Sequence, residues 1–172
     1  MSIIQPPMLP FQAGGSSFVW SQSRITLANT FETPIALFCA KNREVCWDAR
    51  NSVCYTANQY IVLNAYADPT ITQLGDLQNP INMRIGSGTA SSTTVHANPT
   101  LSNYGNFLAS LMVSGPVTSS LLLLIDPDHS LLVTAKASAA NVEVGFGFSW
   151  YELDLTTPTA ASNPVEGVCG KY

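Results

Sequence analysis

The stretch VEVGFGFSWYELDL, residues 142–155, decides the fold class. Apolar and aromatic residues occupy alternate positions in it: Val142, Val144, Phe146, Phe148 and Trp150. Successive side chains of a β-strand point to opposite faces. The pattern therefore predicts one long central strand with an apolar face, in which the glycines allow close packing or bending of the strand.

The rest of the chain has the same character. Short β-rich runs bounded by Gly, Pro, Asn and Asp recur from end to end, while helical periodicity is scarce. The expected strands are residues 16–20, 23–29, 35–40, 52–56, 60–67, 81–85, 91–96, 117–125, 131–137 and 142–155. Only residues 103–113 have a spacing that fits a helix, and a strand fits there nearly as well. The sequence therefore predicts an all-β protein.

The run Leu121–Ile125 is uniformly apolar and does not alternate. Such a run is typical of a strand buried on both faces, either inside the domain or at a contact between subunits. The following Asp126-Pro127-Asp128 is expected to form a hairpin turn into the next strand. Residues 86–94, rich in Gly, Ser and Thr, are expected to form a flexible loop.

Both ends differ from this central part. Residues 1–15 form an uncharged arm interrupted by prolines, residues 16–156 the β-domain, and residues 157–172 a polar tail. An extended arm cannot bury large apolar side chains on itself, so we expect it to pack on its own domain or, preferably, on a neighbouring molecule. The interface candidates in the arm are Ile3, Ile4, Met8, Leu9 and Phe11.

Composition excludes several classes of protein. The 172 residues suit one domain with a sizeable core. Only 10% of them are charged and the net charge is −4, which argues against direct binding of nucleic acid, because neutralising phosphates needs a basic patch. The first residues lack the positive charge and the apolar helix of a signal peptide, and no run approaches the ~20 apolar residues of a membrane span.

Four cysteines, Cys39, Cys46, Cys54 and Cys169, are too few for a disulfide scaffold. Cys46 and Cys54 lie symmetrically about Arg50, so a hairpin there would place them within disulfide reach. Free, partly buried thiols fit equally well, because cytosolic proteins are kept reduced. We predict no zinc site, since the cysteines lack C-x₂₋₄-C spacing.

No catalytic signature is found in the sequence. It contains no G-x-S-x-G, no P-loop and no H-E-x-x-H motif. Asp126, Asp128 and His129 could bind calcium or form an acid–base pair, but Asp, Pro and Ser are ordinary turn formers there. We expect neither an enzyme nor a bound cofactor.

Residues 41–50 (KNREVCWDAR) carry charges of alternating sign around Trp47. Such a cluster is either a recognition patch for a partner, because Trp and Arg are enriched at interface centres, or an exposed hairpin tip with weak ion pairs. Trp47 is therefore an interface candidate, together with Leu121 and Leu123 of the leucine run.

The short strands, the apolar arm, the polar tail and the closing GFGFSWYELDL strand together resemble a single jelly-roll viral coat protein. The chain is most similar to the smaller major capsid protein of tailless icosahedral phages with an internal membrane, the group that includes phages of Thermus. The resemblance implies about eight strands in two sheets with an extended N-terminal arm. It also implies a structural virion protein that forms homodimers or larger oligomers and tiles the capsid shell with a second capsid protein over a lipid membrane.

Two other classes of β-protein fit the sequence. A carbohydrate-binding sandwich, such as a lectin or adhesin module, would be similarly neutral and would expose aromatic side chains. The candidates for that role are Trp47, Tyr55, Tyr60, Tyr66 and Tyr104. A cupin-like enzyme would need a cluster of histidines, which makes it the weakest alternative, because the chain has only His96 and His129.

Overall fold

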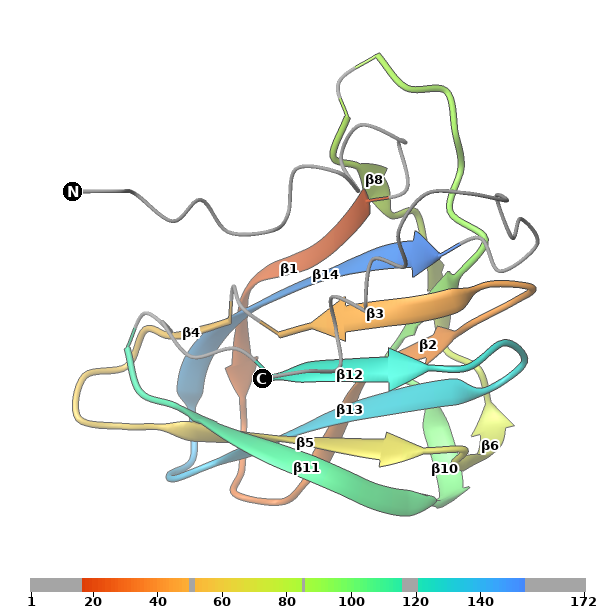
Figure 1. Cartoon of the computed structure of the whole chain (residues 1–172). Coiled ribbons are helices and arrows are strands. Elements are labelled where there is room, and N and C mark those ends of the chain that lie inside the picture. The colour runs from red at the N-terminus through yellow and green to blue at the C-terminus, as the bar shows by residue number, and fades with distance from the viewer. Residues whose placement is uncertain (1–16, 50–51, 85, 116–120, 154–172) are drawn as a thin grey trace, which may run out of the picture.

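The computed structural model describes residues 17–49, 52–84, 86–115 and 121–153, and within them all regular structure is β-strand (Figure 1). The strands are β1 (Ser17–Leu27), β2 (Thr33–Cys39), β3 (Glu44–Asp48), β4 (Val53–Cys54), β5 (Ile61–Ala67), β6 (Thr70–Gln73), β7 (Asp76–Gln78), β8 (Ile81–Asn82), β9 (Thr94–Ala97), β10 (Thr100–Asn103), β11 (Asn106–Val113), β12 (Leu122–Ile125), β13 (Ser130–Ala137) and β14 (Val142–Leu153). The predicted arm, residues 1–15, and the predicted tail, residues 157–172, lie outside these residues.

Two antiparallel sheets face each other across one core. The first has the order β12-β3-β14-β1-β8, with β4 also paired to β14, and the second has the order β11-β5-β13-β2-β9-β7. If β4 and the strands β6 to β10 are left out, eight strands remain, which we number 1 to 8 in chain order. The first sheet then has the order 6-3-8-1 and the second the order 5-4-7-2. This is the order of a jelly roll, built from two Greek keys. The predicted all-β jelly-roll sandwich is confirmed.

The strand β14 lies at the centre of the first sheet, as its alternation predicts, and its apolar residues enter the core. Trp47 and Phe148 stack there with ring centroids 5.2 Å apart, and Phe38 meets Trp150 edge-on at 5.6 Å. Such ring pairs add about 0.5–1.5 kcal/mol each beyond the area they bury. On its opposite face Gly145 leaves room for Tyr55, whose hydroxyl would lie 2.9 Å from an added Cβ atom.

Two segments form continuous strands where the sequence predicted a break or allowed a helix. The two strands expected between residues 16 and 29 form the single strand β1, which bulges between Gln22 and Ile25 in its pairing with β14. Arg24 takes a positive φ of 34° in this bulge. The segment 103–113 contains most of β11, and its helical alternative is wrong because β11 pairs along its length with β5.

The turn at Asp126-Pro127-Asp128 does not form the expected hairpin. It joins β12 to β13, but β12 pairs with β3 in the first sheet and β13 pairs with β2 and β5 in the second. The turn is held at the end of β2, where the amide of Asp128 donates to the carbonyl of Ala40 and the amide of Ala40 donates to the carbonyl of His129. It therefore carries the chain from one sheet to the other.

The charged segment 41–50 is neither a hairpin tip nor a surface patch. Most of it is β3, which lies between β12 and β14 with Val45, Cys46, Trp47 and Asp48 buried. The charges of Lys41, Arg43 and Glu44 precede this buried part, so the hydrophobic contribution of Trp47 to the core determines the local structure.

The chain between β5 and β11 contains a motif that occurs twice. Residues 67–77 read ADPTITQLGDL, and residues 97–107 read ANPTLSNYGNF. We call these segments the first copy and the second copy. In each copy an Asp or Asn at positive φ starts the motif, namely Asp68 at 49° and Asn98 at 53°, and a glycine at positive φ ends its short strand, namely Gly75 at 82° and Gly105 at 87°.

The two copies pack on each other reciprocally. Their short strands β6 and β10 form a separate two-stranded sheet. A Cβ atom on Gly75 would lie 2.1 Å from the carbonyl oxygen of Ala97, and one on Gly105 would lie 2.2 Å from that of Ala67. After its glycine, each copy adds a strand to the other copy's side of the second sheet: β7 pairs with β9, and β11 pairs with β5. The pair of copies thus has an approximate two-fold symmetry.

Candidate interaction surfaces

One side of the sandwich ends in two edge strands that no other described strand covers. These are β11, at the edge of the second sheet, and β12, at the edge of the first (Figure 1). Besides Phe107 of β11, they expose Leu108, Met112, Leu122 and Leu124, each between 45% and 63% accessible. We call this surface the open edge. Unpaired backbone groups beside large apolar side chains are a template for pairing with another chain.

A small cavity of about 160 Å³ links the two strands of the open edge. Its apolar lining includes Leu108 of β11, Leu124 of β12 and Leu131 of β13, and its polar lining includes His129. The cavity shows that β11 and β12 approach each other at this end of the sandwich. The open edge is therefore one surface.

The predicted leucine run is only partly buried. Leu121 and Leu123 are partly buried and pack against the core, whereas Leu122 and Leu124 point to solvent. The expectation of burial on both faces is thus wrong for the single chain, because β12 is an edge strand with only one face against the core. Two places were expected for the run, the interior of the domain and a contact between subunits. The interior is wrong for Leu122 and Leu124, which are exposed, and the contact between subunits stays a prediction.

The other interface candidates have different outcomes. Trp47 is fully buried and contacts Phe38 and Phe148, so its proposed role as an interface residue is wrong. The arm residues Ile3, Ile4, Met8, Leu9 and Phe11 lie outside the described residues.

The expected hairpin disulfide is also wrong. Cys46 is disulfide-bonded, but Cys54 and Cys39 are free thiols. The physical reason is that β3 and β4 run in the same direction along β14: Cys46 lies opposite Tyr151, and Cys54 lies opposite Val144. At about 3.3 Å per residue these positions are too far apart for a bridge, which needs Cα atoms within about 7 Å. Cys169 lies outside the described residues.

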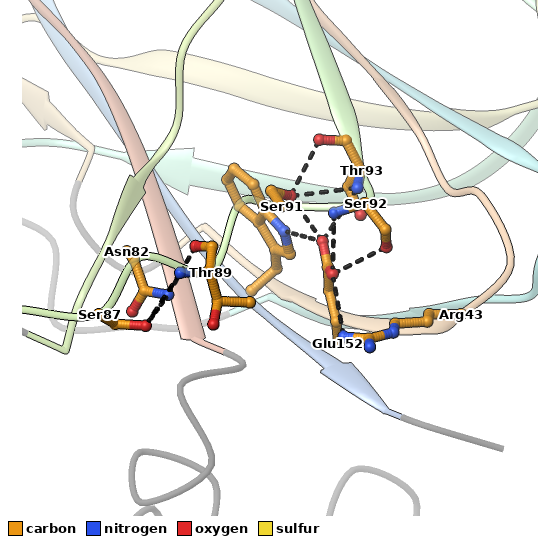
Figure 2. A network of polar contacts seen from close by, with 9 residues as sticks. Arg43, Asn82, Ser87, Thr89, Ser91, Ser92, Thr93 and Glu152 are labelled. Carbon is orange, nitrogen blue, oxygen red and sulfur yellow. Dashed lines mark hydrogen bonds and ion pairs between the residues drawn. The ribbon is translucent and has the colours of Figure 1, made fainter. Parts of the chain in front are cut away.

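A buried carboxylate fixes part of the loop that was expected to be flexible. Figure 2 shows Glu152 of β14 surrounded by Ser91, Ser92 and Thr93. Glu152 accepts the hydroxyls of Ser91 and Ser92 at 2.5 and 2.8 Å and the amides of Ser92 and Thr93 at 3.0 and 2.9 Å. Burial acts to raise the pKa of Glu152, but these hydrogen bonds outweigh it and hold the pKa below its usual value. Because both oxygens of this carboxylate accept hydrogen bonds from the loop, Glu152 anchors the loop to β14.

A second carboxylate lies over the outer face of the second sheet. Glu32, in the turn between β1 and β2, accepts three hydrogen bonds on Oε1, from Asn64 at 2.9 Å, Tyr66 at 2.8 Å and Thr134 at 2.5 Å. Within the described residues, Oε2 accepts none. Partial burial acts to raise the pKa of Glu32, but the three donors and the charge of Lys136 outweigh it and lower the pKa.

Tyr66, whose hydroxyl donates to this carboxylate, is in contact with two further aromatic rings. The ring of Tyr66 lies 5.4 Å from that of Tyr104 and 5.6 Å from that of Phe107, and Tyr104 also donates to the backbone carbonyl of Glu32 at 3.4 Å. Burial, together with the hydrogen bond to Glu32, raises the pKa of Tyr66 to about 12. We call Glu32, Tyr66, Tyr104 and Phe107 the aromatic cluster. Sequence reasoning named the two tyrosines but missed Glu32 and Phe107, although the repeated motif marks Tyr104 and Phe107 as variable positions.

The remaining expected aromatics lie elsewhere. Tyr55 and Tyr60 are exposed and border a depression of about 430 Å³. The guanidinium of Arg24 lies 5.2 Å above the ring of Tyr55, and it also pairs with Glu143 at 3.0 Å. Tyr55 thus already has a cation on its ring.

The polar turn at residues 126–129 makes one ion pair across the molecule. His129 Nδ1 lies 2.8 Å from Asp68 Oδ2, while Asp68 Oδ1 accepts the amide of Ser130. The hydrogen bond to Asp68 and its charge raise the pKa of His129. In the described part of the chain, no group of three His, Cys, Asp or Glu side chains could hold a metal ion.

Comparison with protein-family models, with curated proteins and with solved structures finds no match for this chain. Among the described residues there is no helix long and apolar enough to cross a membrane.

Proposed function

We propose that this protein is a structural coat subunit, which associates with copies of itself through the open edge and tiles an icosahedral virion shell. The observation that carries the proposal is the pair of uncovered edge strands, β11 and β12, which expose Leu108, Met112, Leu122 and Leu124 in addition to Phe107. A monomeric protein usually protects such edges with charge, proline or a covering segment. In the open edge none of these exposed side chains is charged.

The surface chemistry and the fold support the same role. A chain with only 10% charged residues has few like charges to repel a second copy. The jelly roll is an architecture of viral coat domains, although the fold alone does not determine function. From the resemblance of the sequence to capsid proteins, the proposal includes a second capsid protein as a further partner and an internal membrane beneath the shell.

The proposal is tested by measuring the solution mass of the full chain, by light scattering on a sizing column over a range of concentrations. We expect the wild type to form a dimer or a larger closed species. The variant Leu122→Lys/Leu124→Lys places two charges on the open edge and should shift the protein to monomer, because a charged edge opposes strand pairing. Both side chains are already exposed, so the domain itself should fold.

A matched control adds the same charge elsewhere. Thr72→Lys/Thr100→Lys changes two exposed residues of the β6–β10 sheet and should leave the oligomer intact. A wild type that stays monomeric at every soluble concentration, alone and with reductant, would contradict self-association. An oligomer that survives the lysines on the open edge would place its interface on another surface.

A further inference from the structure

We propose that the aromatic cluster is a binding site for a neutral carbohydrate. The site adjoins the open edge, because Phe107 belongs to β11, and it goes beyond the coat-subunit function. The repeated motif allows the side chains of the cluster to be compared with those that the same backbone carries in the other copy.

The register of the second sheet aligns the two copies along one row of its outer face. Consecutive neighbours in the row, from edge to edge, are Phe107, Tyr66, Leu132, Leu37, His96 and Leu77. Its central residues, Leu132 and Leu37, are buried, while its end residues, Phe107 and Leu77, are 58% and 64% exposed. The backbone thus presents two equivalent exposed positions at opposite ends of the row.

The side chains at equivalent positions differ in kind. Where the second copy has Tyr104 and Phe107, the first copy has Leu74 and Leu77. Leucine therefore satisfies both positions of the motif, and the backbone does not require aromatic rings there. The motif itself therefore does not require the rings of the second copy, and Tyr104 and Phe107 are 37% and 58% exposed.

Of the two ends of the row, only the end near the second copy has phenyl and phenol rings, and these lie near the carboxylate of Glu32 and the amide of Asn64. The carboxylate of Glu32 keeps Oε2 free of described partners, and Asn64, whose amide nitrogen binds Oε1 of Glu32, lies beside it. Sugars bind by laying their C–H face on an aromatic ring while their hydroxyls bond to nearby carboxylates and amides. Exposed rings with a few fixed polar groups provide both contacts.

The charges around the cluster favour a neutral ligand. The charge of Lys136 contributes to the lowered pKa of Glu32, so the carboxylate already lies in the field of a positive charge. A cationic ligand would meet Lys136, whereas an apolar peptide would cover the carboxylate without bonding to it, which costs free energy. A hydroxyl-rich neutral ligand avoids both costs.

The test is to apply the full-length protein to an array of neutral mono- and oligosaccharides built from glucose, galactose, mannose and N-acetylglucosamine. Bound sugars are then titrated by saturation-transfer NMR. We expect the wild type to bind at least one sugar. Tyr104→Leu/Phe107→Leu, which gives the second copy the side chains of the first, should weaken binding by about tenfold or more, as expected for the loss of two ring contacts.

The matched control removes the equivalent side chains from the other end of the row. Leu74→Ala/Leu77→Ala should keep the affinity within about twofold, because these residues lie far from the cluster. Absence of sugar binding by the wild type would overturn the proposal, as would unchanged binding by Tyr104→Leu/Phe107→Leu. Tighter binding of tetramethylammonium than of any sugar would instead identify the cluster as a cation site. Phe107 belongs to β11, so the single variant Tyr104→Leu, which leaves β11 and β12 unchanged, is tested as well. Its oligomer should be that of the wild type, which separates this result from the test of self-association.

Discussion

The two copies of the repeated motif share a backbone and differ in their side chains. Both begin with an Asp or Asn at positive φ, contain Pro and Thr at the same places and end with a glycine pressed against a carbonyl of the other copy. Where the first copy has Leu74 and Leu77, on either side of its glycine, the second copy has Tyr104 and Phe107. The comparison separates what the backbone requires from what it leaves free, and the free positions are where a binding function can develop.

The largest expected effect is at the glycines, where the two copies should behave alike. Gly75→Ala and Gly105→Ala each combine a strained positive φ with a Cβ that would overlap a carbonyl oxygen. We expect each to lower the free energy of unfolding by about 2–4 kcal/mol in urea denaturation. Gly88→Ala is the control, since nothing lies within 4 Å of its added Cβ. A large loss in only one copy would break the proposed symmetry.

A smaller effect should distinguish the residues that begin the copies. Asp68→Ala and Asn98→Ala place alanine at a similar positive φ, so that cost is common to both. Asp68, however, also accepts the amide of Ser130 at 3.1 Å and pairs with His129 at 2.8 Å. We expect Asp68→Ala to lose about 1 kcal/mol or more of stability beyond the loss in Asn98→Ala, in the same denaturation assay, because it removes both contacts. Equal losses would mean that neither the Ser130 bond nor the His129 pair contributes measurably.

The smallest effect is a dependence on pH that belongs to the first copy alone. Asp68 raises the pKa of His129, so the stabilisation from the charged histidine is fully present below its ordinary pKa and is lost as pH rises through the raised value. The amide of Ser130 and His129 outweigh the effect of burial and lower the pKa of Asp68, whose contribution is lost as pH falls through that lowered value. The pair therefore stabilises the fold most in the mildly acidic range between the two ordinary pKa values.

This pH dependence is checked by NMR titration of the imidazole. In the wild type the pKa of His129 should lie above the value usual for histidine, and Asp68→Asn should return it to about 6.5. Asn98→Asp offers the complementary control, since a carboxylate in the second copy should leave the titration of His129 unchanged. An unaltered pKa in Asp68→Asn would remove the pair from this account.

The fold was predictable because the sequence of its central strand, β14, alternates regularly between apolar and small or polar residues. The alternation from Val142 to Trp150 determines both the position of β14 and the face it buries, and the structure has them as expected. Sequence reasoning failed where two signals compete. Charges beside Trp47 suggested a surface turn, but burying an indole among other rings outweighed them. The symmetric cysteines suggested a hairpin, but β3 and β4 run along the same strand.

The surfaces were less predictable than the fold. The leucine run indicated a contact, but only pairing reveals that β12 is an edge strand and that Leu122 and Leu124 are the exposed members. The contacts of Glu32 join residues up to 102 positions apart, such as Thr134, so no local pattern could reveal them. The repeated motif, by contrast, is visible in the sequence itself, at Gly75 and Gly105 and around them.

The position of β14 has a consequence for how the chain folds during synthesis. It is the last described strand to be made, yet it pairs with β1, β3 and β4 and forms the middle of the first sheet. Until residue 153 leaves the ribosome, β1 and β3 have no common partner, whereas β2, β5 and β13 of the second sheet are already available. Long-range strand pairing of this kind is slow, and incomplete sheets are prone to aggregate. The nascent chain should therefore stay vulnerable until β14 has been synthesised, and its demand for chaperones should fall once β14 is available for pairing.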